Sequence, residues 1–187
     1  MKKILKKHNL KLPVIISFLL GIATGVGYNE ISPTASWHSF HNETDNLNVC
    51  FTPPSGCGSL IAQEISKAKD SIYIQAFGLT SQKIVDQLIK AKQNGVEIRV
   101  LLDRSNLHDR YSKMHELKRA GIDVSIDKVP GIAHNKIMII DKSKVITGSF
   151  NFTNAADNRN AENVLLIENS DIAETYLQSW LSRRAKN

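Results

Sequence analysis

Short apolar runs and amphipathic segments alternate along residues 48–182, and this alternation most constrains the fold. Runs rich in β-branched residues predict strands at 48–51, 71–77, 96–102, 122–126, 136–141, 144–148 and 163–168. Apolar residues at helical spacing predict helices at 60–69, 81–94, 111–120 and 171–182. Helices between strands imply crossover connections and a sheet covered on both faces. We therefore expect one α/β domain with a mixed, mostly parallel β-sheet flanked by helices on both faces.

The amino terminus has the pattern of an export signal. Residues 1–27 contain five lysines and no acidic residue, and an apolar run spans 14–26 before small residues. The run is short for a bilayer span, which favours a removable signal peptide over an uncleaved anchor. Residues 28–47 are polar without a sustained period and predict a flexible linker, leaving 48–187 as the folded domain. Secretion is expected, or retention in the envelope or periplasm if the anchor stays.

The positive charge of the chain belongs mostly to this amino terminus. The formal net charge is +6, from 24 basic and 18 acidic residues. Without the first 27 residues, 19 basic residues face 18 acidic ones, a balance of +1. A nearly neutral domain argues mildly against a long polyanion as the substrate.

Cys50 and Cys57 are the only cysteines, and the residues between them include Pro-Pro-Ser-Gly. In an exported chain this spacing favours a disulfide, with two unpaired thiols as the alternative. Nothing nearby resembles the four ligands of a structural zinc site. We expect neither a metal nor another cofactor.

The densest group of chemically useful side chains runs from His134 to Glu162. On extended backbone, residues i and i+2 face the same way, so His134 and Lys136 should point together. Asp141 lies an odd number of residues from both and should point to the opposite face. The first two side chains would supply an imidazole and a fixed cation to one surface.

A second cluster follows at a glycine. Ser149 and Asn151 share a face directly after Gly148, whose missing side chain would let a ligand approach the backbone. Asn160 and Glu162 again share a face. Together the two clusters predict a surface with an imidazole, an ammonium, a hydroxyl, amides and a carboxylate.

This set of groups suits a phosphodiester. A lysine and amide donors can neutralise the charge that builds on the phosphate oxygens. A neutral histidine can attack phosphorus, but the leaving alcohol then needs a proton from a second, protonated histidine. His108 and His115 lie among charged residues, where a surface role is the default. A homodimer that places two copies of His134 across one phosphate is the consistent solution.

The spacing H-x-K-x4-D-x6-G-S-x-N resembles the signature of the phospholipase D superfamily, and N-A-E-N at 160–163 resembles its downstream Asn-x-Glu element. The resemblance extends over residues 49–182 and includes C-F-T-P-P and L-L-D-R-S-N. It is strongest to small secreted bacterial phospholipase D proteins, and next to EDTA-resistant endonucleases of similar size.

The resemblance implies a role for each matched residue. His134 would be the nucleophile that forms a phosphohistidine, and a second copy of His134 would be the general acid. Lys136, Ser149 and Asn151 match positions that bind the substrate phosphate. Glu162 matches the carboxylate that orients the histidine.

Asp141 completes the motif and by resemblance belongs to the catalytic group with His134 and Lys136, although the strand parity favours a structural role. The family needs no metal. Its larger members carry two copies of the motif in one chain, whereas this chain has one, which again favours a homodimer.

Three functions follow as hypotheses. The first is a secreted, metal-independent phospholipase D that hydrolyses phosphatidylcholine-type phospholipids at a membrane surface to phosphatidate and choline, with a virulence role implied by resemblance. The second is a non-specific EDTA-resistant endonuclease, the one reading in which nucleic acid is a partner. The third is a non-catalytic module that binds phosphate-bearing surfaces.

Overall fold

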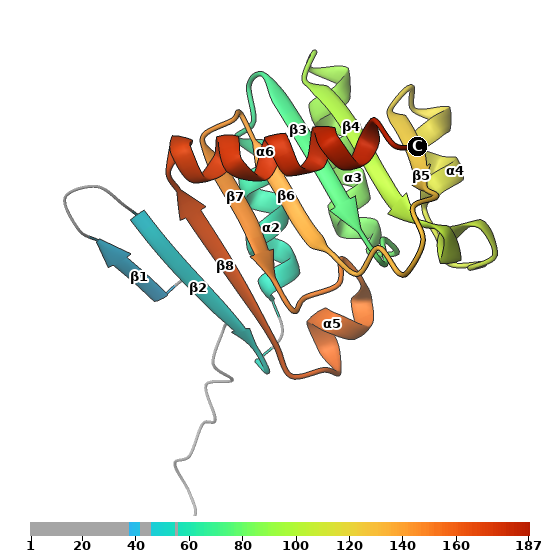
Figure 1. Cartoon of the computed structure of the whole chain (residues 1–187). Helices are drawn as coiled ribbons and strands as arrows, with labels where there is room; N and C mark the ends of the chain where they lie inside the picture. Colours follow the sequence, from blue (N-terminus) through green and yellow to red (C-terminus); the bar gives the residue numbers. More distant parts are fainter. Residues whose placement is uncertain (1–37, 42–45, 55) are drawn as a thin grey trace, which may run out of the picture. The chain divides into compact units, whose positions relative to one another are not determined.

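The computed structural model describes residues 38–41, 46–54 and 56–187. They form an eight-stranded sheet in the order β1-β2-β8-β7-β6-β3-β4-β5 (Figure 1). The strands are β1 His38–His41, β2 Asn46–Thr52, β3 Ser71–Ala76, β4 Glu97–Asp103, β5 Asp123–Asp127, β6 Lys136–Ile140, β7 Lys144–Gly148 and β8 Glu162–Glu168. The helices are α2 Cys57–Ser66, α3 Gln82–Gln93, the 3-10 helix η1 Arg104–Leu107, α4 Met114–Arg119, α5 Asn154–Asn158 and α6 Ser170–Arg184.

Helices cover both faces of the sheet, as the sequence predicts. Every residue of the central strands β3 and β6 is buried, which explains their continuous apolar runs. On one face, apolar residues of α2, α3 and α4 form the larger core with the sheet. On the other face, α6 crosses the strands and packs through Ala173, Leu177 and Trp180 (Figure 1). The Trp180 indole donates a hydrogen bond of 2.9 Å to the Ile74 carbonyl.

The mixed sheet is confirmed, but the expected parallel majority is wrong. β3–β4 and β4–β5 are parallel, while the other five neighbouring pairs of the described strands are antiparallel. Helical crossovers produce parallel neighbours only where consecutive strands end up adjacent, as α3 does for β3 and β4. β6 instead enters beside β3 and continues through a tight turn into β7, so the strands on this side alternate in direction.

The segment expected as a linker contains a strand. β1 pairs antiparallel with β2, and β2 begins at Asn46 rather than at residue 48. Part of 28–47 is therefore sheet, because the backbone of β2 offers a free edge that a polar segment can pair with. The proposed signal peptide at 1–27 and residues 28–37 and 42–45 lie outside the described residues.

Two helices differ from the sequence-based expectation. The helix expected at 111–120 begins at Met114, because the chain first turns through η1, whose amino end is capped by the Asp103 carboxylate. α5 was not foreseen; five residues are too few to show a helical period. A disulfide joins Cys50 to Cys57, with Cα atoms 6.0 Å apart, and so links β2 to the first residue of α2. In the described part of the chain, no helix has the length and apolar character to cross a membrane.

Candidate active site

Four chain segments meet at one end of the sheet. β6 is antiparallel to β3 with Lys136 opposite Ala76, and β8 is antiparallel to β7 with Val164 opposite Gly148. The ends of β3 and β7 therefore lie beside the starts of β6 and β8. The motif residues before β6, after β7 and at the start of β8 are brought together by this register alone.

His134 lies in the loop that leads into β6, and its side chain is exposed. Its backbone N–H donates to the Ile132 carbonyl at 3.0 Å. Its ring lies against the ring of Phe77, with centroids 4.9 Å apart and planes inclined by 56°. The Phe77 N–H donates to Asn135 at 3.0 Å, which ties the end of β3 to this loop. Phe77 thus forms one wall behind the imidazole.

Asp103 holds the loop that contains His134 in place. Its buried carboxylate accepts the Ala133 N–H at 2.8 Å, one residue before His134, and the Ser105 N–H at 2.9 Å. Burial pushes the pKa of Asp103 upward, but these hydrogen bonds outweigh burial and hold it below its usual value. Arg104 donates to two carbonyls of the same loop, at Val129 and Gly131. In the sequence, the strand-end segment L-L-D-R-S-N was the signal that could have pointed to Asp103 and Arg104.

Lys136 is a buried cation directed at the site. Its side chain is only 7% exposed, and Nζ donates to the His134 carbonyl at 2.6 Å. Nζ also lies 5.3 Å from the centroid of the Phe77 ring. Burial lowers the pKa of Lys136, and the nearby Glu162 carboxylate partly offsets this. A desolvated ammonium with one carbonyl partner attracts an anion more strongly than one in water does.

Ser149 and Glu162 form a hydrogen-bonded unit with Asn160. The Ser149 hydroxyl donates to Glu162 Oε2 at 2.5 Å, and Asn160 Nδ2 donates to Oε1 at 2.8 Å. In the described residues, the Glu162 carboxylate therefore contacts these two side chains rather than His134 of the same chain. Its expected role in orienting the histidine stays a prediction.

The neighbouring strand β8 requires a glycine at position 148. A Cβ at this position would lie 2.3 Å from the Asn163 carbonyl oxygen, and the residue has φ of +142°. The glycine is needed because the β8 backbone approaches it, and the approach of a ligand at this position stays a prediction. This close approach lets the Asn163 N–H donate to Ser149 Oγ at 3.1 Å.

Asn151 carries a buried acceptor without a partner. Its Oδ1 is buried and makes no hydrogen bond to any described residue. Leaving such a group unpaired costs about 1–3 kcal/mol, so it marks a place where a ligand or a rotated amide can restore pairing. The residue is held by its backbone carbonyl, which accepts the Thr153 N–H at 2.7 Å.

Asp141 does not join the other motif residues, which corrects its grouping with His134 and Lys136. It follows β6 at the end opposite to Lys136. Its carboxylate accepts the backbone N–H groups of Lys69, Asp70 and Ser71 at 2.8–3.2 Å. The residue has φ of +51°, a conformation that aspartate tolerates better than most residues. Asp141 therefore fastens the β6–β7 turn to the start of β3.

A groove of about 950 Å³ contains none of the motif residues in its lining but reaches Thr153, whose N–H donates to the Asn151 carbonyl. Its walls come from the loop after η1, from α4 and from the start of α5, and they include Thr80 and Thr153. The basic residues in this lining are Arg110, Lys113, His115, Arg119 and Arg159. His115 thus lies in the groove wall and His108 on the exposed surface.

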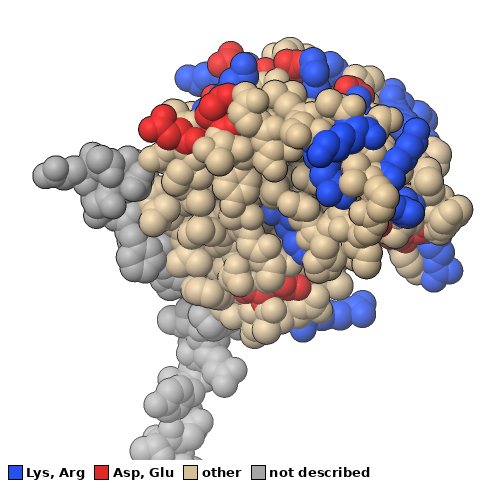
Figure 2. Space-filling model, in the orientation of Figure 1, with Lys and Arg blue, Asp and Glu red and all other residues tan. Residues whose placement is uncertain are grey.

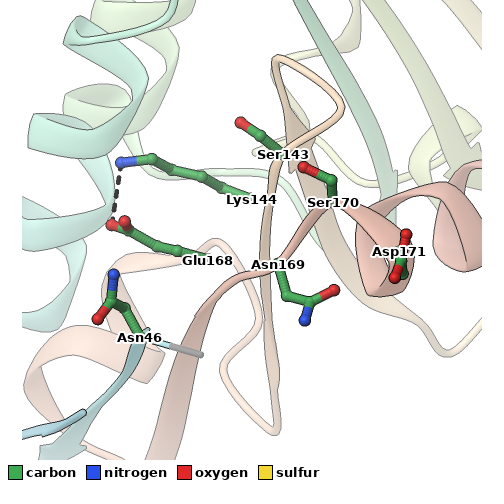
Figure 3. Close-up of a pocket in the computed structure, with 7 residues that line it drawn as sticks. All are labelled: Asn46, Ser143, Lys144, Glu168, Asn169, Ser170 and Asp171. Atoms are coloured by element: carbon green, nitrogen blue, oxygen red, sulfur yellow. Dashed lines mark ion pairs between the residues drawn. The ribbon is translucent and has the colours of Figure 1, made fainter. Parts of the chain in front are cut away.

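A smaller pocket of about 360 Å³ lies at the far end of the sheet (Figure 3). Its lining contains none of the motif residues. Lys144 forms ion pairs there with Glu168 at 3.0 Å and with Glu64 at 3.3 Å. Burial acts to lower the pKa of Lys144, but these two carboxylates raise it above its usual value. This pocket is therefore a structural ion-pair region.

The side chains present at the site are hydrogen-bond donors and a cation rather than a set of metal ligands. Among residues 46–54 and 56–187, no three His, Cys, Asp or Glu side chains are grouped so that they could hold a metal ion. The arrangement provides an exposed imidazole, a buried ammonium and a hydroxyl at one end of the sheet, with a buried amide in the segment after β7. It is suited to holding an anionic group and attacking it.

Comparisons with known proteins agree with this geometry. A family model described as "Cardiolipin synthase, PLD-like domain" matches residues 61–183. The chain is 52% identical over 200 residues to a phospholipase D of Rickettsia bellii, covering 98% of this chain and 100% of that protein. It is 31% identical over 137 residues to the mouse mitochondrial cardiolipin hydrolase, covering 68% of this chain and 62% of that protein. The crystal structure of Nuc, a phospholipase D family member from Salmonella typhimurium, superposes with a TM-score of 0.73 at 33% identity, covering 75% of this chain and 95% of that chain.

We predict that Asp141→Asn destabilises the protein without changing the chemistry of the folded fraction. Hydrogen bonds to a charged group contribute about 1.5–3 kcal/mol, so the free energy of unfolding in urea should fall by a similar amount. His134→Asn is the matched control and should retain stability while losing activity. A fall in kcat of Asp141→Asn at unchanged stability would instead place Asp141 in the reaction.

We predict that Lys136→Met gives an inactive protein at least as stable as the parent. Because burial lowers the pKa of Lys136, the unfolded chain holds more protons between that lowered pKa and the usual value of 10.5. The stability of the parent should therefore rise with pH across this window, and the variant should lack that rise. Urea unfolding from neutral to alkaline pH measures both effects. A clear loss of stability at neutral pH would show that the ammonium stabilises the fold.

Proposed function

Because the chain belongs to the phospholipase D superfamily, we propose that this phosphodiesterase is a secreted phospholipase D acting on phosphatidylcholine-type lipids. The observation that carries the proposal is that the exposed His134 imidazole and the buried Lys136 ammonium both lie near the Phe77 ring. Ser149 and Glu162 lie at the same end of the sheet. Identity of 52% to a phospholipase D over the whole length of that protein favours a lipid substrate.

The proposed reaction has two steps. An imidazole nitrogen of His134 attacks phosphorus, the bond to the head-group oxygen breaks, and that oxygen takes a proton from a second, protonated histidine. Water then attacks the phosphohistidine, gives its proton to the second imidazole, and releases phosphatidate. Lys136 and Ser149 hold the phosphate oxygens as charge builds on them. The unpaired buried Oδ1 of Asn151 supports a ligand-contacting role for that amide.

The second histidine is proposed to come from a second copy of the chain. His108 lies on the exposed surface and His115 in the wall of the groove, and among the described residues the ring that contacts His134 is Phe77. A homodimer with one shared site supplies both imidazoles from His134 alone. The chain then needs only one copy of the motif.

Export is part of the proposal. The lysine-rich start and the apolar run at 14–26 support a removable signal peptide, and an uncleaved anchor in the envelope is the alternative. A disulfide between Cys50 and Cys57 is consistent with an oxidising compartment. A secreted enzyme that cleaves membrane lipids would suit a role in virulence.

A second candidate is a non-specific endonuclease that needs no metal. The basic groove that reaches Thr153 favours it, because Arg119 and Arg159 have no ion-pair partner among the described residues. Such cations can follow a nucleic-acid backbone as readily as a lipid surface.

Both candidates are tested in one assay. Full-length protein and His134→Asn are each given phosphatidylcholine vesicles or plasmid DNA in excess EDTA. We expect choline release by the parent alone, with the plasmid left intact. Nicking without choline release would reject the lipid substrate in favour of the endonuclease, and loss of activity in EDTA would contradict a metal-free reaction.

Mixing tests the shared site. Parent and His134→Asn chains are unfolded together, refolded at varied ratios and assayed. If each site needs both histidines, activity per total protein falls with the square of the parent fraction, because mixed dimers are inactive. A linear fall, or a fully active monomer in sedimentation, would refute the shared site. Sedimentation of His134→Asn alone controls for lost dimerisation.

A further inference from the structure

Two neighbouring loops carry apolar side chains into solvent. The loops are 104–113, which follows β4, and 128–135, which follows β5 and contains His134. Leu107, Tyr111 and Ile132 are 52%, 60% and 68% exposed. These are three of the five large hydrophobic side chains that are exposed among the described residues. Their gathering on two loops distinguishes them from the single exposed apolar residues found on any protein.

The two loops are held together and to the active site. Arg104 in the first loop donates to the carbonyls of Val129 and Gly131 in the second. Asp103, directly before the first loop, accepts the N–H of Ala133 in the second. Ile132 stands two residues before the proposed nucleophile. The apolar side chains are therefore displayed on a braced support beside the site.

Positive charge accompanies these side chains. The basic residues of the two loops are Arg104, Arg110, Lys113 and Lys128. The two loops contain one acidic residue, Asp109. Arg110 lies over the Tyr111 ring, 4.6 Å from its centroid. Figure 2 shows Lys and Arg side chains gathered on the side of the domain where Figure 1 draws β4 and β5.

We propose that this loop surface, formed by Leu107, Tyr111, Ile132, Arg110 and Lys128, docks the enzyme on an anionic lipid bilayer. The inference rests on the proposed lipid function and adds how the site reaches its substrate. Exposed apolar side chains enter the region between head groups and acyl chains, and the surrounding cations pair with anionic head groups. Tyr111 places an apolar ring and a polar hydroxyl at that boundary.

Other occupants fit the surface less well. A nucleic-acid backbone would use the cations but gains nothing from exposed Leu107 and Ile132. Stacking on bases requires a row of aromatic rings, and the loops offer Tyr111 alone. A second copy of the chain is the remaining occupant, and it is an outcome of the test below.

Local fluorescence tests docking without relying on the amino-terminal apolar segment. Tyr111→Trp is made in the His134→Asn background and mixed with vesicles of phosphatidylcholine and phosphatidylglycerol with brominated acyl chains. Leu181→Trp, at an exposed position on α6, is the matched control, and the unsubstituted background gives the signal of the two natural tryptophans. We expect quenching at position 111 and none at 181. Equal quenching at both positions, or none at 111, would overturn the proposal.

Hydrolysis tests whether docking serves the site. Leu107→Glu should slow hydrolysis of anionic vesicles about tenfold, a loss in the range for burying one leucine side chain. It should leave hydrolysis of a short-chain, monomeric phosphatidylcholine unchanged, and Leu181→Glu should change neither. Equal loss on both substrates, or conversion of a dimeric parent to a monomer, would overturn docking and assign the surface to the site or to a second copy. If the parent hydrolyses neither lipid, the proposed function fails and the quenching result alone decides docking.

Discussion

The antiparallel register between β3 and β6 is the constraint on which the site depends. Pairing Lys136 with Ala76 places Phe77, the next residue of β3's segment, against both the His134 ring and the Lys136 ammonium. A slip of one residue would turn every side chain of β6 to the opposite face and bury the wrong set. Because β6 is buried on both faces, that slip would exchange the side chains that pack into the two cores on either side of the sheet. The strand register that packs the core is therefore also the one that brings Phe77, His134 and Lys136 together.

The site contains buried polar groups whose environments are unfavourable for folding. A buried ammonium with a lowered pKa, an amide oxygen without a partner among the described residues and an exposed imidazole all belong to residues 134–151. The buried ammonium and the unpaired buried oxygen are unfavourable for folding, and the ammonium is useful for holding an anion. The rest of the fold compensates through well-paired groups, such as the carboxylate of Asp103 beneath the His134 loop.

The motif thus divides between two ends of one strand. His134 and Lys136 lie at the start of β6, and Asp141 follows its end, where three backbone N–H groups surround its carboxylate. From lysine to aspartate, the motif covers the five residues of the buried strand and the first residue of its turn. The motif therefore combines two residues at the start of β6 with an aspartate that holds the far end of the strand in place.

The sequence by itself determined the longer helices, seven of the eight described strands and the common side of His134 and Lys136, because periods of two and 3.6 residues are local properties. It also indicated that Asp141 faces away, by the parity of residues along a strand. Tertiary structure alone decided the strand order, the antiparallel majority and the strand β1. It also decided that Phe77 packs against the His134 ring, that Asp103 holds the loop before it, and that Ser149, Glu162 and Asn160 form one hydrogen-bonded unit. These depend on which strands become neighbours, and that choice is made by burial over the whole core rather than by any short stretch of residues.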